Sequence, residues 1–319
     1  MGSPLATLAS RPGRRGAAAL GLLLLLVGCE AAAGGPERRS EGLLTLSTGD
    51  RALLEVIATA PDGAVAIGLP LPDDGATWIS AGPDGVLVAS TSDGRLATSD
   101  PVDPRGSAVA LAGLAWEPVE ATMESGGSLP RPASFPTWDP EGKRIAALGG
   151  DIADGTAMTL LLVEPRDGRV TTIAPKEAVT GPPAWLDSTR VALPTGSAAD
   201  PTSIVVDTTS GKVTKGPPGE RRLATSADGA VIATSAGPGA PVVLRSTNGW
   251  LADDGTSIGS VEVPKGFVEA TALALDATGR RLAIVWRHED GSTQCDVHDG
   301  EDGWRRVLGH GGTVAAWLR

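Results

Sequence analysis

The sequence predicts an all-β fold, and within that class a β-propeller of six blades, with seven blades as the alternative. Three observations support this prediction. The 319 residues include 43 Gly and 25 Pro, which disfavour long helices. The apolar residues form short runs without a helical period. Similar segments recur at intervals in the forties, which is the period of a propeller blade.

The N-terminal segment, residues 1–28, is a predicted export signal. Arginines precede an apolar run over residues 17–28. This run is too short to span a bilayer, which takes about 20 residues, and the basic-then-apolar order is typical of a signal peptide. The run ends in Leu26-Val27-Gly28-Cys29, which resembles the lipobox of bacterial lipoproteins. The resemblance implies cleavage between Gly28 and Cys29 and lipid attachment to the Cys29 thiol. An ordinary signal peptide with an incidental cysteine is the alternative.

Residues 29–42 are small, polar and contain Gly and Pro, so we expect a lipidated, flexible tether ahead of a propeller domain over residues 43–319. The chain has a net charge of −11, which argues against a nucleic-acid partner because the basic surface needed for one is missing. Anionic lipid headgroups would also repel an acidic domain, so the acyl chains must hold it. We expect it on the extracytoplasmic face of a bacterial cell membrane.

The domain is expected to consist of short strands closed by tight turns. Asp-Gly pairs follow many of the apolar runs, and this dipeptide favours hairpin turns because both residues tolerate a left-handed backbone. Many short strands with frequent turn signals indicate an all-β domain. In chain order, the predicted strands include Ala64–Pro70, Gly85–Ser90, Arg144–Leu148, Thr159–Val163, Ser203–Val206, Val231–Thr234, Val242–Leu244 and Arg281–Trp286.

Four segments repeat one layout, an apolar residue before a turn and an apolar pair after it. Their equivalent turn positions are Gly142, Ser188, Gly229 and Gly279, spaced by 46, 41 and 50 residues. The clearest copy, residues 136–146, resembles the WD40-like (PD40) repeats of TolB-type propellers, whose pattern is P-x-W-S-P-D-G-x-x-I-A. The resemblance covers residues 134–319. It implies a propeller and envelope partners, but no activity.

The chain ends suggest how the ring closes. The strand-like segment Val314–Leu318 resembles the strand that ends at Trp138, but the chain stops before another hairpin. We therefore expect this segment to pair with N-terminal strands around residues 43–57, which leaves no open sheet edge. Residues 101–133 do not fit the repeat, and a seventh blade there is the alternative.

Residues 73–78 resemble the Asp-box of sialidase-like propellers, S-x-D-x-G-x-T-W, with Leu71 at the usual Ser position. In that motif the Asp binds backbone amides, so the box is an element of the fold. Sialidases of this type use a Tyr nucleophile, and the chain has no Tyr. The resemblance therefore supports a propeller and not sialidase chemistry.

Two sets of residues are candidates for catalysis. Ser257 lies in a G-x-S-x-G pattern, but this nucleophile elbow needs a strand before it and a helix after it, and the following residues are strand-like. Paired carboxylates occur at residues 73–74, 253–254, 289–290 and 301–302, but turns explain such acids. We expect no catalytic residue.

His288, Cys295 and His298 are candidate metal ligands, because imidazole and thiolate groups bind metals such as zinc. Residues 295 and 298 are three apart, so on a strand they face opposite sides. We expect no metal, with Cys295 a buried small hydrophobe. His310 lies in a Gly-rich loop and is expected to be exposed.

These observations predict a non-enzymatic, lipid-anchored binding or assembly module for an envelope protein, peptide or glycan. No cofactor and no nucleic acid are expected, and the chain is expected to be a monomer. The alternative is a glycan-active hydrolase or lyase with acidic residues at the propeller mouth.

Overall fold

The fold was obtained as a computed structural model. It describes residues 41–47, 51–57, 65–103, 111, 113–123, 126–127, 129, 132–150, 158–197, 199–300, 305–308 and 312–318. Residues 1–38 form one unit and residues 39–319 another. The signal peptide, Gly28, Cys29 and most of the tether lie outside the described residues, so those predictions stay predictions. In the described ranges, no helix has the length and apolar character to cross a membrane.

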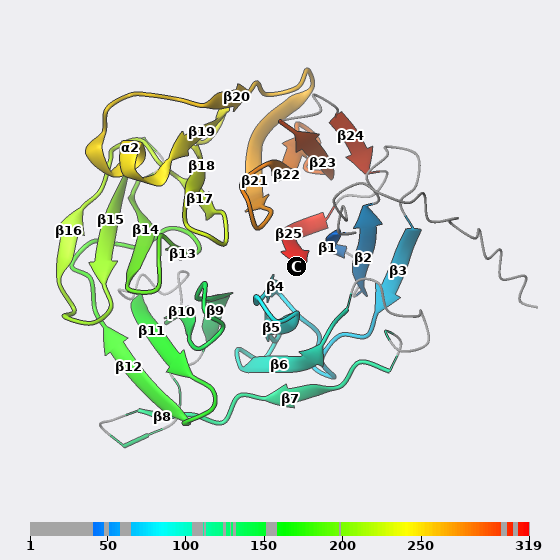
Figure 1. Cartoon of the computed structure of the whole chain (residues 1–319), viewed down its shortest axis with the longest axis vertical. Helices are drawn as coiled ribbons and strands as arrows, with labels where there is room; N and C mark the ends of the chain where they lie inside the picture. Colours follow the sequence, from blue (N-terminus) through cyan, green and yellow to red (C-terminus); the bar gives the residue numbers. More distant parts are fainter. Residues whose placement is uncertain are drawn as a thin grey trace, which may run out of the picture. The chain divides into compact units, whose positions relative to one another are not determined.

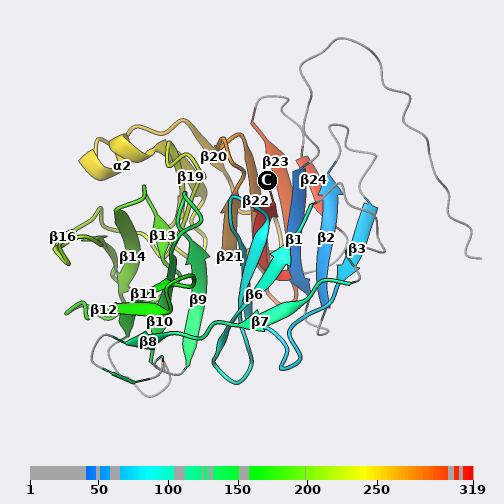
Figure 2. The same cartoon turned by 60° about the horizontal axis from the view of Figure 1, so that its bottom comes forward.

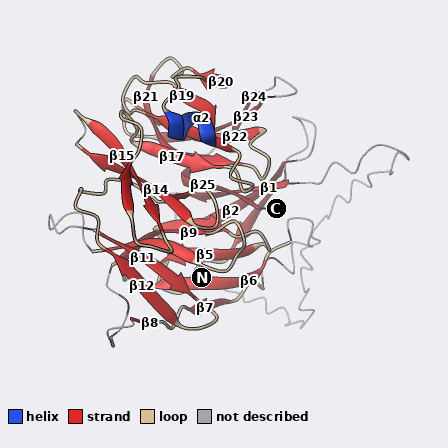
Figure 3. Cartoon of the chain, turned by 60° about the vertical axis from the view of Figure 1, so that its left-hand side comes forward, coloured by secondary structure: helices blue, strands red, loops and turns tan. Residues whose placement is uncertain are grey.

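The described strands form six sheets around a common centre, with a short helix on the outside (Figures 1 and 3). We name each sheet after its innermost strand. The β25 sheet contains β25 (Gly312–Leu318), β1 (Glu41–Ser47), β2 (Arg51–Ile57) and β3 (Val65–Leu69). The β4 sheet contains β4 (Trp78–Ala81), β5 (Val86–Ser90), β6 (Leu96–Pro101) and β7 (Trp116–Pro118). The β9 sheet contains β9 (Ala133–Trp138), β10 (Ile145–Gly149), β11 (Thr159–Glu164), β12 (Arg169–Ile173) and β8 (Thr122–Met123).

The remaining three sheets follow in chain order. The β13 sheet contains β13 (Ala184–Trp185), β14 (Arg190–Gly196), β15 (Pro201–Asp207) and β16 (Val213–Lys215). The β17 sheet contains β17 (Arg222–Thr225), β18 (Val231–Ser235), β19 (Val242–Ser246) and β20 (Gly259–Val261). The β21 sheet contains β21 (Phe267–Leu275), β22 (Arg281–His288), β23 (Thr293–Asp299) and β24 (Arg305–Leu308).

The prediction of an all-β propeller is confirmed, and each of the eight predicted strands overlaps an observed one. The inner strands touch one another in the order β25, β4, β9, β13, β17, β21 and again β25. The view in Figure 2 shows the strands of a sheet standing side by side, as in β1, β2 and β3.

The two ends of the domain meet in one sheet. Strand β25 pairs antiparallel with β1, with Leu43 opposite Trp317 and Leu44 opposite Ala316. Strand β1 starts at residue 41, so it includes the last two residues assigned to the tether. A C-terminal strand thus completes a sheet that otherwise consists of the first three strands of the domain.

Tight turns after the inner strands explain the repeated glycines. The backbone φ is +67° at Gly142, +69° at Gly229 and +71° at Gly279, in the left-handed region that favours Gly. The amide of Gly229 donates to the Ser226 carbonyl at 2.9 Å, and the other two make the same bond. A Cβ on Gly229 would lie 2.3 Å from the Leu186 oxygen, in the preceding sheet's turn. These glycines therefore serve both the turn and the approach of neighbouring sheets.

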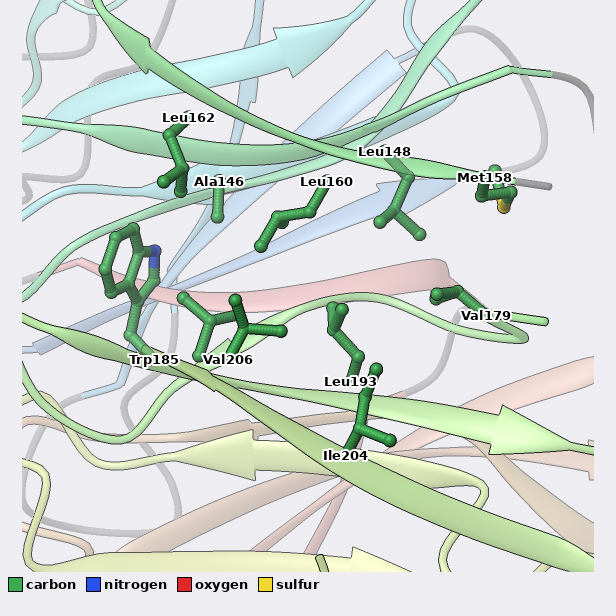
Figure 4. Packing of buried hydrophobic residues seen from close by; sticks show 11 residues of the cluster. Ala146, Leu148, Met158, Leu160, Leu162, Val179, Trp185, Leu193, Ile204 and Val206 are labelled. Carbon is green, nitrogen blue, oxygen red and sulfur yellow. The ribbon is translucent and has the colours of Figure 1, made fainter. Parts of the chain in front are cut away.

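The core lies between the sheets. Leu148 and Leu160 of the β9 sheet pack against Leu193 and Ile204 of the β13 sheet (Figure 4). The alternate residues of the same strands, such as Leu161, belong to the cluster shared with the β4 sheet. Successive side chains of a strand point to opposite faces, so a sheet covered on both faces needs an unbroken apolar run. This is why the sequence shows apolar runs rather than alternation.

Two features differ from the sequence prediction. The described residues of 101–133 form no sheet of their own. Strand β7 lies at the edge of the β4 sheet, and β8 pairs parallel with β12 at the edge of the β9 sheet. The alternative of a seventh blade in this segment is therefore not supported.

The helix α2 (Thr247–Ala252) was not predicted. Ser246 caps its N-terminus, because the Ser246 side chain accepts a hydrogen bond from the Gly249 amide. Asp253 caps its C-terminus with a left-handed φ of 50°.

Candidate functional site

The inner strands surround a central channel, which is the candidate site. The channel contains about 140 Å³ of free space and takes wall residues from all six sheets. Most of its wall residues are small or apolar. They include Ile79, Thr137, Pro183, Ala224, Thr225, Ala272, Ala274 and Ala316. Four tryptophans, Trp78, Trp138, Trp185 and Trp317, also line the channel, and its small volume suits a slender ligand.

Hydrogen bonds between neighbouring inner strands fix the channel wall. The Trp185 indole donates to the Thr137 carbonyl at 3.1 Å, and the Trp317 indole donates to the Ala274 carbonyl at 3.1 Å. The Thr225 hydroxyl donates to the Trp185 carbonyl at 2.6 Å. In each case the donor lies one sheet further along the chain than the acceptor. The wall is therefore preorganised, and these two indole N–H groups are used within the protein.

One charged side chain lines the channel among the described wall residues, and it is Arg222 at the start of β17. Its Nε donates to the Thr271 carbonyl at 3.0 Å and its Nη1 to the Arg221 carbonyl at 3.1 Å. Burial lowers the pKa of Arg222, Glu269 opposes this effect, and the charges of Arg221 and Arg287 add to it. We call this end of the channel the arginine mouth.

Glu269 lies beside the arginine mouth and is 7% exposed. Its Oε1 accepts from Arg287 Nη2 at 2.6 Å, and its Oε2 lies 3.7 Å from Arg221 Nη1. Arg287 is in the β21 sheet and Arg221 immediately precedes β17, so this carboxylate joins two neighbouring sheets. Two guanidinium groups therefore engage this carboxylate directly, and its charge also acts on Arg222.

Comparison with solved structures supports the fold. TolB from Acinetobacter baumannii is 13% identical with a TM-score of 0.59, and the match covers 87% of this chain and 66% of that chain. The fold is similar to that of TolB. A putative TolB from Agrobacterium tumefaciens is 13% identical with a TM-score of 0.54, covering 86% of this chain and 92% of that one. A chain of a nidogen–laminin complex is 10% identical with a TM-score of 0.60, covering 88% and 98%.

No protein-family model matches the sequence, and no curated protein matches it. At identities of 10–13%, the structural matches show the β-propeller fold alone. The resemblance to TolB-type propellers that the repeats suggested is thus supported at the level of fold.

The candidate metal ligands His288, Cys295 and His298 do not form a metal site. Cys295 is buried in β23, and His298 follows three positions later on the same strand. The His288 ring lies edge-on to Phe267, with centroids 4.9 Å apart, and its Nδ1 is 3.8 Å from Asp290 Oδ1. Within the described ranges, no three His, Cys, Asp or Glu side chains form a group that could hold a metal ion.

The other candidate site residues, taken from the nucleophile-elbow, Asp-box and paired-carboxylate patterns, lie in turns. Ser257 is exposed between α2 and β20, which is the reverse of the strand–turn–helix order of a nucleophile elbow. Asp73, which holds the Asp position of the Asp-box-like segment, is exposed, and the neighbouring Asp74 carboxylate pairs with Arg95 Nη2 at 2.9 Å. Asp290 accepts the Ser292 amide at 2.8 Å. His310 and residues 301–302 lie outside the described residues.

Arg222 is the functional candidate that the sequence analysis missed. The only local signal is a pair of arginines, Arg221 and Arg222, directly before the apolar start of a repeat. Their partner Glu269 is in the next sheet along the chain. A second missed feature is Gly82-Pro83-Asp84-Gly85, which forms the same turn as the repeats at Gly142, Gly229 and Gly279, with Gly85 at a φ of 76°. The repeat at Ser188 differs, because Ser188 is not in the left-handed region.

Proposed function

We propose that this protein is a non-enzymatic binding module and that its ligand is an extended peptide segment of an envelope partner that enters the central channel. The observation that carries the proposal is the channel wall. It encloses about 140 Å³, is fixed by inter-sheet hydrogen bonds, and is lined mostly by small residues with one arginine. Rigid sites of this kind lose little conformational entropy on binding.

A complete ring would explain this rigidity. We propose that the six sheets are the whole set of blades and that the pairing of β25 with β1 closes the ring. The contacts of the inner strands, each with its two neighbours, support this closure. A closed ring has no open edge between its first and last blades.

The enzyme alternative has less support. A glycan hydrolase or lyase needs carboxyl groups on either side of the bond that it breaks. None of the described residues that line the channel is Asp or Glu.

We propose further that Cys29 carries a lipid after removal of residues 1–28, and that residues 30–40 link the lipid to β1. The support is the order of basic residues, apolar run, Gly28 and Cys29 in the sequence. The resulting location is the extracytoplasmic face of a bacterial membrane. The channel would then meet segments of other envelope proteins.

Site-specific photocrosslinking in intact envelopes tests the channel as the binding site. A diazirine amino acid replaces Ala224 in the channel wall, and in the control it replaces Lys215, an exposed residue of the outer strand β16. We expect a partner adduct from position 224 that is weak or missing from position 215. No adduct at position 224, or equal adducts at both positions, would contradict the proposal.

A further inference from the structure

The arginine mouth holds more positive than negative charge. Arg221, Arg222 and Arg287 bring three guanidinium groups together, and Glu269 supplies one carboxylate. Glu269 is already engaged by Arg287 at 2.6 Å and by Arg221 at 3.7 Å. This local excess of positive charge occurs in a chain whose net charge is −11. An acidic protein has no general reason to gather cations at one end of its channel.

Arg222 is the cation that the protein does not neutralise directly. The bonds that the structure gives its side chain are to two backbone carbonyls, those of Thr271 and Arg221. A guanidinium has five N–H donors, so these two bonds leave other donors that can bind a ligand. A partly buried cation is costly unless it is paired with an anion. Its position in the channel wall lets a ligand provide that anion.

The shape of the channel narrows the ligand class. A planar guanidinium fork binds a carboxylate through two parallel N–H bonds. The neighbouring wall residues Pro182, Leu223 and Ala272 are uncharged, and the channel holds only about 140 Å³ of free space. A slender chain that carries a carboxylate satisfies both conditions.

We propose that the arginine mouth is a carboxylate-recognition site, in which Arg222 binds a carboxylate of the peptide that enters the channel while Arg221 and Arg287 add long-range attraction. This inference rests on the proposed function and makes it more specific. The carboxylate belongs either to an acidic side chain or to a peptide C-terminus. In both cases, binding should weaken as salt rises, because part of the attraction is between charges.

Defined peptide pools test this site. The first pool holds octapeptides of Gly, Ala, Ser and Thr with a central Glu and both ends blocked. The second carries Gln at the same position, and the third is the Gln pool with a free C-terminal carboxylate. Retention of each pool on the immobilised protein is measured by mass spectrometry. We expect the Glu pool, the free-carboxylate pool or both to be retained about tenfold more strongly than the blocked Gln pool, as for hydrogen bonds to charged groups.

Three variants assign the effect. Arg222→Met should abolish the preference for carboxylate, and Arg222→Lys, which keeps the charge but not the fork, should weaken it. The control Arg169→Met removes a 62%-exposed arginine on β12 and should change nothing. Circular dichroism checks that each variant is folded, and if Arg222→Met is not, Arg222→Lys and the salt dependence decide the matter.

Equal retention of the three pools, no retention of any pool, or a carboxylate preference that survives in folded Arg222→Met would overturn the carboxylate site. The proposed function has a separate test. If the photocrosslink at Ala224 still captures a partner while the pools show no carboxylate preference, the channel binds a ligand of another chemistry. If the crosslink fails as well, the binding function fails with it.

Discussion

Gly229→Ala tests the packing of neighbouring sheets. The substitution places a Cβ at a φ of +69° and 2.3 Å from the Leu186 carbonyl oxygen. A left-handed backbone costs an L-residue about 1–2 kcal/mol, and the reduced entropy of the unfolded chain returns about 0.4–1 kcal/mol. Relief of the overlap requires a backbone shift, for which overpacking costs about 1–3 kcal/mol. We expect a total loss of about 2–4 kcal/mol in the free energy of unfolding.

The matched control is Gly211→Ala. Gly211 has the same φ of +69°, but no atom lies within 4 Å of its added Cβ. We therefore expect a loss of only about 1 kcal/mol, from the backbone alone. Urea unfolding of both variants measures the difference. If Gly211→Ala and Gly229→Ala lose the same stability, the close contact between the β13 and β17 sheets does not exist as described.

Three further predictions concern other parts of the chain. Cys29→Ala should move the protein from the membrane pellet to the soluble fraction, and a variant that still pellets would reject the lipid anchor. Deletion of residues 315–319 removes most of β25 and should lower the unfolding midpoint of the whole domain, whereas an unchanged midpoint would reject closure. The Ser210 amide and hydroxyl and the Thr209 amide hold the pKa of Asp207 below its ordinary 3.8. This carboxylate thus stabilises the fold above pH 3.8, and the contribution is lost as the pH falls through its lowered pKa, so Asp207→Asn should flatten the acid limb of the stability–pH curve. An unchanged acid limb would contradict this assignment.

The sequence predicts the sheets well because turns and cores leave local signals. Gly142, Gly229 and Gly279 recur since each turn needs a left-handed residue at the same place. The copy at Gly85 was missed for a physical reason. It lies 57 residues before Gly142, because the segment that supplies β7 and β8 separates the two hairpins and hides the period. The six-residue helix α2 is likewise too short to show a helical period.

The candidate site was beyond sequence reasoning because its residues meet only through the ring. Arg222 and its acceptor Thr271 are 49 residues apart, and nothing near either one indicates the contact. Trp185 illustrates the same point. Its repeat predicts an apolar residue before the turn, but only the fold shows its indole bonded to Thr137 of the preceding sheet. Local patterns predict the blades, whereas the chemistry of the channel depends on how the blades are placed.

A cysteine pair across β1 and β25 tests the central claim most directly, namely that the two ends of the domain join in one sheet and close the ring. Leu44 and Ala316 are directly opposite in the observed register. In a Cys29→Ala background, Leu44→Cys with Ala316→Cys should form a disulfide on mild oxidation and raise the unfolding midpoint. The control pair Leu44→Cys with Lys215→Cys should not form one. Failure of the first pair to crosslink in the folded protein would contradict the closed ring.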